Sequence, residues 1–304
     1  MIGLAATPLM ARTESLPVRF SFAPPANKNY VQREIHVETG RVGVIQKRVS
    51  LASETAVRVS KEAGRIFLLN HIDRVAKARD GKPVEEPMVG AMTGTEVVYV
   101  LRPDGGMERI DGLKRFNDRV LAALQGEDRA AFEKRVRDNR LEQRTRASWF
   151  ETTEILAGQT LELDRDYFFD SAWPTDDGWI QHQTLLRLGP WEKTVSGRQL
   201  RVKTAYVTDA KAALPGALRL QPRVQTTFAP ANPGPLAIGL TISGNASRLV
   251  DPTTLTIWRD QSSRQIRSRV QMSEEMSVTV SSEETSDITL VPAPASAPPK
   301  PAAN

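Results

Sequence analysis

Cysteine is absent from this 304-residue chain, and histidine occurs only three times. Without thiols the sequence can form no disulfide, offers no thiolate nucleophile and has no cysteine for a lipid anchor. The histidines His36, His71 and His182 lie far apart and at no metal-ligand spacing, so no metal site or catalytic triad is predicted. No run of eighteen apolar residues occurs, so no transmembrane helix is predicted.

Motifs that carry catalysis are missing as well. The sequence contains no Gly-x-Ser-x-Gly elbow and no glycine-rich phosphate loop, so we predict no enzymatic activity and no cofactor. Asp164, Asp166 and Asp170 resemble the start of a calcium loop. They lack the glycine of the sharp turn and a downstream bidentate glutamate, so a solvated acidic turn is favoured.

The net charge of the chain is weakly positive. Lysine and arginine number 41 against 36 aspartates and glutamates, which gives +5 at neutral pH and a pI near 9.5. Such a charge favours encounters with acidic surfaces but is too small to indicate nucleic-acid binding. Zinc-finger spacing, an aromatic–basic ribonucleoprotein motif and a basic tail are all missing. Nucleic acid is therefore not a predicted partner.

Composition along the chain indicates a single domain with two atypical ends. Hydrophobic residues make up 40% of the sequence, enough for a real core, and we predict one β-rich domain over residues 16–291. Residues 1–15 are predicted to be a truncated signal-like segment or a disordered one. Residues 292–304 are mostly proline and alanine and are predicted to be a disordered tail. The signal-like composition favours a periplasmic or secreted location.

Short runs of β-type residues separated by turn residues fill most of the chain on either side of residues 111–147. This pattern is typical of antiparallel strands. One strong run, residues 95–101, leads through a turn at Asp104–Gly105 into a short return strand, because glycine accepts the positive φ that a tight turn requires. The sequence predicts an α+β, β-rich fold: a curved antiparallel sheet, or half-barrel, with a helical insert packed on it.

Residue alternation also predicts which side chains face the core. In residues 30–38, Val31, Ile35 and Val37 share one face of a strand. His36 has the opposite parity and is predicted to face solvent.

The helical insert, at about residues 111–147, has two unlike halves. In the first half, one helical stripe carries Ile110, Leu113, Phe116, Val120, Leu121 and Leu124. This half is predicted to be an amphipathic helix that covers the sheet as a lid. The pattern leaves open whether Leu113, Phe116, Val120 and Leu124 cover a packed core or line a ligand cavity.

The second half of the insert, residues 127–146, is predicted to be a polar helix. Its later turns are basic and include Arg135, Arg140 and Arg144. One interpretation is a solvated face with ion pairs to Glu133, Asp138 and Glu142. The other is a basic ledge for an anionic lipid headgroup or another polyanion.

Aromatic residues are frequent after residue 148. Core packing is the ordinary role of the tryptophans there. The alternative is that some of them, including Trp149 and Trp179, line a ligand cavity between the sheet and the helices.

The order of these elements resembles a known bacterial architecture. A hairpin at Asp104–Gly105 precedes the helices, residues 153–163 re-enter the sheet, and another hairpin spans residues 251–260. This organisation resembles exported domains of unknown function that are similar to the lipoprotein-localisation-factor fold. The resemblance covers roughly residues 18–280 as a pattern rather than a motif. It implies a half-barrel closed by helices around a cavity for acyl chains or lipoproteins.

Two hypotheses for the function follow. The first is a non-enzymatic periplasmic or envelope protein that binds an apolar or acyl ligand, a lipid or a lipoprotein acyl chain, between sheet and helices. The second is an envelope scaffold that binds another protein through a strand edge or its tail, without a small ligand.

Overall fold

The computed structural model describes residues 17–42, 45–176, 178–208, 216–226, 239–271 and 277–294. The predicted signal-like segment 1–15 lies outside these residues, as does most of the predicted tail. The last described strand runs to Pro292, which pairs with Tyr30. Pro292, the predicted first residue of the tail, therefore still belongs to the sheet.

The described residues form one large sheet. Its order is β12-β9-β10-β11-β13-β14-β15-β2-β3-β4-β6-β7, with β5 attached to β4. All pairs in this sheet are antiparallel except the parallel pair β12–β9. A separate pair of strands, β1 and β8, lies beside it. The strands are β1 (Val18–Arg19), β2 (Lys28–Val42), β3 (Ile45–Glu62), β4 (Arg65–Arg79), β5 (Lys82–Val84), β6 (Glu96–Leu101), β7 (Met107–Asp111), β8 (Thr160–Leu161), β9 (Asp166–Thr175), β10 (Gly178–Thr194), β11 (Gly197–Val207), β12 (Leu218–Arg219), β13 (Leu240–Asp251), β14 (Thr256–Gln271) and β15 (Ser277–Pro292).

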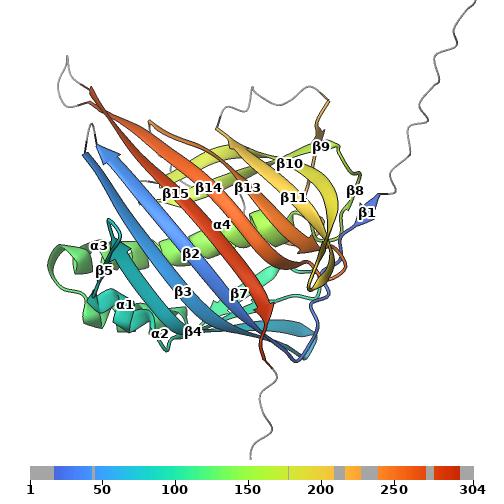
Figure 1. Cartoon of the computed structure of the whole chain (residues 1–304), viewed down its shortest axis with the longest axis horizontal. Coiled ribbons are helices and arrows are strands. Elements are labelled where there is room, and N and C mark those ends of the chain that lie inside the picture. Colours follow the sequence, from blue (N-terminus) through green and yellow to red (C-terminus); the bar gives the residue numbers. More distant parts are fainter. Residues whose placement is uncertain are drawn as a thin grey trace, which may run out of the picture.

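The sheet is strongly curved, and the helices lie on its concave side (Figure 1). Register shifts interrupt the ladders at Glu54/Thr55, Val100/Leu101, Leu188/Trp191 and Leu249/Val250. Bulges of this kind bend a strand and increase its twist. The two edge strands, β12 and β7, do not pair with each other, so the sheet is not closed into a barrel. The predicted fold class, a curved antiparallel half-barrel with a helical insert, is confirmed.

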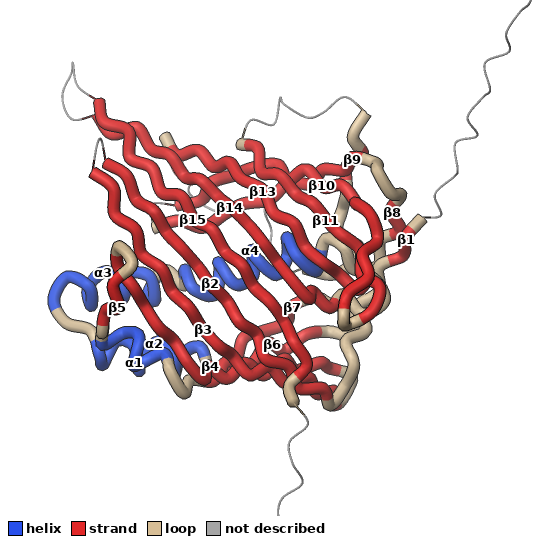
Figure 2. Tube along the Cα trace, viewed as in Figure 1, coloured by secondary structure: helices blue, strands red, loops and turns tan. Residues whose placement is uncertain are grey.

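The helical insert contains three helices and a π-helical turn rather than two helices. A short helix, α1, precedes it, and all the helical segments lie on one side of the sheet (Figure 2). The prediction of one continuous helix over residues 127–146 was wrong, because Asn139 adopts a left-handed conformation with φ of 57° and interrupts it. The segments are α1 (Pro87–Met92), α2 (Leu113–Ala123), α3 (Gly126–Arg137), α4 (Arg140–Trp149) and the π-helix η1 (Phe150–Glu154).

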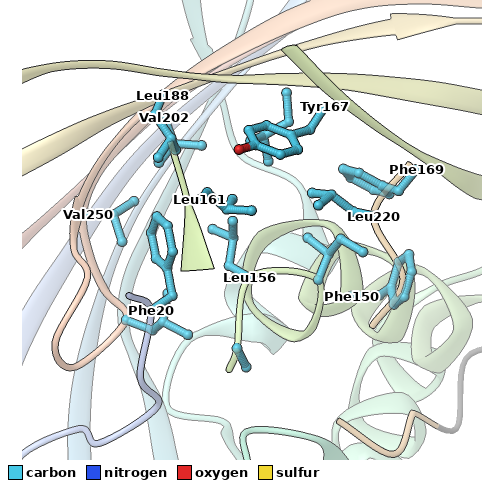
Figure 3. Packing of buried hydrophobic residues seen from close by; sticks show 14 of the residues in the cluster. Phe20, Phe150, Leu156, Leu161, Tyr167, Phe169, Leu188, Val202, Leu220 and Val250 are labelled. Carbon is cyan, nitrogen blue, oxygen red and sulfur yellow. The ribbon is translucent and has the colours of Figure 1, made fainter. Parts of the chain in front are cut away.

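The main core fills one half of the concavity. The segment around η1 packs there against β9, β10, β11 and β13 (Figure 3), with Phe150 and Phe169 in an edge-to-face contact at 5.9 Å between ring centroids. Leu188, Leu200 and Val250 are fully buried in the same cluster. The strong core at this end fixes the position of α4, which leads directly into η1.

Two smaller clusters complete the packing. One lies at the base of the other half of the sheet, where Tyr30, Val57, Val59 and Ile66 pack against Leu101 and Met107. The other lies among the helices and holds them to one another: Ala91, Val120 and Phe132. The concave space between these clusters and the main core is bordered by α4.

The facing of β2 is opposite to the prediction. Ile35 is 57% exposed, on the convex side, whereas His36 lines a cavity on the concave side. Which side chains of β2 point inward is decided at the start of the strand. There Tyr30 is buried, and its ring contacts Trp258 edge-to-face at 5.9 Å between centroids. Because side chains alternate strictly along a strand, burying Tyr30 forces every even-numbered residue up to Glu38 inward.

Replacement of a main-core side chain should destabilise the whole fold. Leu188 is fully buried, so Leu188→Ala should lower the free energy of unfolding by about 2–5 kcal/mol through lost burial and a residual cavity. Urea unfolding followed by far-UV circular dichroism measures this loss. Val195→Ala, at a fully exposed turn position, is the control and should change stability by less than about 0.5 kcal/mol. Equal effects of the two substitutions would contradict the assigned core.

Candidate functional site

Helix α4 borders three adjoining cavities on the concave face of the sheet. They have volumes of about 240, 350 and 330 Å³ and are here named the apolar, charged and lid cavities. Ser148 and Thr152 border both the apolar and the charged cavity, Arg144 borders the charged and the lid cavity, and Tyr99 borders the apolar and the lid cavity. These shared residues make the three spaces neighbours along one helix.

The apolar cavity lies over the base of the sheet. Its walls come from β2, β3, β4, β14 and β15 on one side and from the end of α4 on the other, and they include Tyr30, Val57, Leu68, Trp149, Ile257 and Leu290. Trp149 is held in place, because its Nε1 donates to the Gly105 carbonyl at 2.9 Å and its ring contacts Phe22 and Tyr99 edge-to-face. A fixed aromatic wall of this kind is typical of a ligand pocket for apolar groups.

The lid cavity lies between the sheet and helices α2 and α4. Apolar side chains from both sides line it, among them Ile72, Val97, Ile110, Leu113, Phe116 and Leu141. Gln32, Asn70 and Tyr99 connect it to the apolar cavity.

The charged cavity adjoins the apolar cavity at the C-terminal part of α4 and lies over a later part of β2. Five carboxylates border it, Glu34, Glu38, Glu151, Asp260 and Glu284, together with three guanidinium groups, Arg144, Arg248 and Arg264. His36 and Trp173 complete its walls with several hydroxyl groups. The site beneath α4 therefore changes from apolar to ionic along β2, from Tyr30 to Glu34 and Glu38.

A buried polar cluster forms the floor of the charged cavity. The carboxylate of Glu151 is fully buried and lies 3.0 Å from His182 Nε2, and it accepts a hydrogen bond from Ser171 Oγ at 2.6 Å. Arg264 Nη2 lies 3.6 Å from its second oxygen. The π-helical turn η1 positions Glu151, and π-helical turns occur frequently at functional sites.

The surroundings of Glu151 keep it ionised. Burial alone raises the pKa of this carboxyl, but the hydrogen bond from His182 and the charges of His182 and Arg264 outweigh burial and lower it to about 2. The Glu151 side chain therefore carries its negative charge at all physiological pH values.

The other two buried charges of the cavity wall are also held. Arg248 is 5% exposed and donates from Nε to Asp260 Oδ2 at 2.9 Å. The guanidinium of Arg264 stacks 3.6 Å from the centroid of the Trp173 ring and 4.8 Å from that of Tyr206. These contacts orient both arginines toward the concave space at a fixed position.

Burial shifts the pKa values of two groups in the walls of this cavity, Glu34 and Arg144. It raises the pKa of Glu34, and the negative charge of Asp260 adds to that shift. It lowers the pKa of the Arg144 guanidinium, against the effect of Asp176. Glu34 is half-buried, whereas the Arg144 side chain is 39% exposed, so the wall at Arg144 is in contact with water.

Four of the nine residues proposed from the sequence for the ligand cavity or the basic ledge border this site. Leu113 and Phe116 line the lid cavity, Trp149 lines the apolar cavity, and Arg144 lines the charged and lid cavities. The helical stripe thus covers open space on the sheet at its N-terminal end.

Three other proposed cavity residues lie elsewhere. Val120 is fully buried between the helices, and Leu124 packs against the same cluster, because their end of α2 faces α1 and α3 rather than the sheet. Trp179 is 7% exposed and belongs to the main core. For these residues the structure supports core packing, which was the alternative interpretation of their pattern.

The three arginines of the predicted basic ledge, Arg135, Arg140 and Arg144, also have different surroundings. Arg135 forms a bidentate pair with Asp176, in the turn between β9 and β10, with contacts of 2.8–3.2 Å. Arg144 donates to the Pro174 carbonyl at 3.3 Å, and Arg140 donates to the Gln143 side chain at 3.1 Å. Arg135 therefore ties α3 to the sheet, and of the three only Arg144 is among the residues that line the cavities.

Two of the three aspartates of the possible calcium loop form ion pairs with arginines. Asp166 pairs with Arg187 at 2.6 Å, and Asp170 pairs with Arg219. Among the described residues, no group of three potential ligands from histidine, cysteine, aspartate and glutamate comes together to hold a metal ion.

Several residues of the charged cavity were not found from the sequence. Glu34, Asp260, Arg264 and Glu284 look like ordinary solvent-facing charges of alternating strands. Glu151 gave the one usable signal, since an acidic residue directly after Trp149-Phe150, in an apolar stretch, is atypical of a core element.

Comparisons with known proteins leave the family undetermined. No family model matches the chain, and no curated protein matches it. Among solved structures, a DUF1329 family protein from Desulfovibrio piger aligns at 10% identity over 89% of this chain and 88% of that one, with a TM-score of 0.14. The translocator domain of the autotransporter NalP from Neisseria meningitidis aligns at 8% identity over 87% and 89%, with a TM-score of 0.18.

A third similar structure is the MucA/MucB complex of Pseudomonas aeruginosa, at 10% identity over 87% of this chain and 94% of that one, with a TM-score of 0.14. TM-scores this low do not establish a common fold, and they carry no information on what this chain binds. Within the described residues, no helix is long and apolar enough to cross a membrane.

Acid should remove the stabilisation that Glu151 provides. Its lowered pKa means that the contribution is complete above the unfolded value of 4.5 and is lost as pH falls toward about 2. The shift corresponds to on the order of 3 kcal/mol at neutral pH. Urea unfolding of the wild type and of Glu151→Gln at pH 7 and pH 3 should show a smaller loss between the two pH values in the variant.

Glu283→Gln, at an exposed position on β15, is the matched control and should retain the pH dependence of the wild type. An identical pH dependence for Glu151→Gln and the wild type would contradict the assigned ion pairing.

Proposed function

We propose that this protein binds the apolar part of an amphipathic ligand, an acyl chain of a lipid or lipoprotein, between α4 and the concave face of the sheet. The observation that carries the proposal is the apolar cavity of about 240 Å³ beneath Trp149, which continues into the lid cavity. Ligand sites typically have volumes of about 300–1,000 Å³. The adjoining cavities together provide space on that scale.

The apolar lining suits an acyl chain for a simple energetic reason. Burial of apolar surface is favourable by about 25 cal/mol per Å². The fixed rings of Trp149 and Tyr30 provide that surface without having to be ordered on binding.

The role we propose is binding without a chemical reaction. The buried cluster of Glu151, His182 and Ser171 does not form a hydrolytic triad, because Ser171 donates to the carboxylate and not to the imidazole. Its geometry supports a structural role under the charged cavity.

The edges of the sheet favour a cavity ligand over a protein partner bound by strand addition. Strand β12 has two residues and β7 has five. The charged side chains Glu108, Arg109 and Asp111 lie on β7 and pair locally or with Arg65. Short, charged edge strands are poor templates for strand addition.

The same proposal places the protein in the periplasm or outside the cell. Its basis is the apolar, small-residue composition of the first eleven residues and the resemblance to lipoprotein-localisation-factor-like domains.

A cavity-blocking variant tests the proposal. The probe is a fatty acid carrying a dansyl group, titrated into the purified protein while its fluorescence is recorded. Binding of one probe per protein is expected for the wild type. Ser148→Trp should weaken binding at least tenfold, because Ser148 lies on α4 and borders both the apolar and the charged cavity.

Ala131→Trp places the same bulk at an exposed position on α3 and should bind like the wild type. Thermal unfolding of both variants verifies that they fold. Absence of probe binding to the wild type, or equal binding to Ser148→Trp and Ala131→Trp, would contradict the proposed site.

A further inference from the structure

The charges of the charged cavity do not cancel in pairs. Asp260 is neutralised by Arg248, and Glu151 is held by His182 and Arg264. Among the described residues, the carboxylates of Glu34, Glu38 and Glu284 have no ion pair, and the first two accept only hydroxyl hydrogen bonds, from Ser286 and Ser282. The cavity therefore holds more than one charge that its own ion pairs do not satisfy.

Two of the remaining carboxylates oppose each other directly. In the β2–β15 ladder Glu38 pairs with Glu284, and both line the charged cavity, Glu284 half-buried and Glu38 exposed at its solvent side. Like charges at directly opposite positions of an antiparallel pair are destabilising. An ammonium group between Glu38 and Glu284 would convert this repulsion into two favourable contacts.

The neighbouring position presents the opposite charge. In the β14–β15 ladder Arg264 pairs with Glu284, so Arg264, Glu284 and Glu38 follow one another across three adjacent strands. Adjacent strands lie about 4.8 Å apart. A positive and a negative binding position thus lie one to two strand spacings apart on the same wall.

Arg264 can also donate one further hydrogen bond. Its Nε is buried and has no hydrogen-bond partner among the described residues. A buried donor without a partner is costly, on the order of 1–3 kcal/mol, unless something accepts from it. Arg144, on the helical wall of the same cavity, places a second guanidinium near Glu284.

We infer that the charged cavity binds a zwitterionic head group, with its anionic group at Arg264 and Arg144 and its ammonium between Glu284 and Glu38. The inference rests on the proposed function, because the apolar cavity continues into this space at Ser148, Thr152, Asp260 and Ile288. The ligand class is therefore a zwitterionic amphiphile: an acyl chain with an amine and an acid in its head group.

Other head groups fit the walls less well. A purely anionic head group would leave the Glu38–Glu284 repulsion in place and add to it. A purely cationic one would leave the Arg264 Nε without an acceptor. An uncharged head group would satisfy neither position.

A panel of single-chain probes separates these cases. Four tetradecyl or tetradecanoyl compounds are titrated below their micelle concentrations by isothermal calorimetry: lysophosphatidylethanolamine, lysophosphatidylglycerol, tetradecylamine and monotetradecanoylglycerol. The zwitterionic probe should bind at least tenfold more tightly than each of the other three. Equal affinity for lysophosphatidylglycerol or for tetradecylamine would overturn the zwitterion assignment. Failure of all four probes to bind would overturn the proposed function itself.

A variant then locates the ammonium position. Glu38→Gln combined with Glu284→Gln should reduce the affinity for lysophosphatidylethanolamine at least tenfold, to that of lysophosphatidylglycerol, and should leave monotetradecanoylglycerol unaffected. The double variant should fold, since it removes a like-charge pair, and its melting temperature should equal or exceed that of the wild type. The control is Glu283→Gln. Glu283 directly precedes Glu284 on β15 and is exposed, so this variant should bind all four probes like the wild type. An unchanged preference for the zwitterion in the double variant would overturn the assignment.

Discussion

The anchoring of η1 in one half of the sheet is the constraint on which the rest of the structure depends. Phe150 packs into the main core, and Glu151 is held by His182 and Ser171 on β10 and β9. These contacts fix the end of α4 to one half of the sheet, and Arg146 and Trp149 tie it to β7 and the preceding turn at the other edge. The helix therefore crosses the concavity without filling it, and the space between α4 and strands β2, β14 and β15 stays open. The candidate site is a direct result of this attachment near the edges of the sheet.

The curved sheet gives that space two chemically different ends. Near the start of β2, the buried side chain of Tyr30 belongs to a small apolar cluster. Toward the end of β2 the same face carries Glu34, His36 and Glu38. A strand that lines a core throughout would be apolar on its inner face. Here the inner face becomes ionic where the core ends and the cavity begins, which is the arrangement an amphipathic ligand requires.

Much of the fold could be predicted, because it depends on local patterns. Alternating residues and turn residues indicated antiparallel strands, and the stripe containing Leu113 and Phe116 indicated a helix lying on the sheet. The break at Asn139 was missed, since Asn carries no obligatory signal for a left-handed conformation. The site was predicted only in part. Trp149 borders a cavity as one interpretation had it, whereas Trp179 is a core residue, and composition alone does not distinguish the two.

The sequence by itself determined the strands, the helical insert and the lack of thiol chemistry, because these depend on residue type and spacing along the chain. Only the tertiary structure decided which side of β2 faces inward, since Ile35 and His36 are equally regular members of one alternation. It also decided which charges meet. Glu38 is more than two hundred residues from Arg264 and Glu284, which lie on the neighbouring strands β14 and β15, and strand pairing alone brings all three to one wall. The anchoring of η1 then leaves that wall facing an open cavity rather than a packed core.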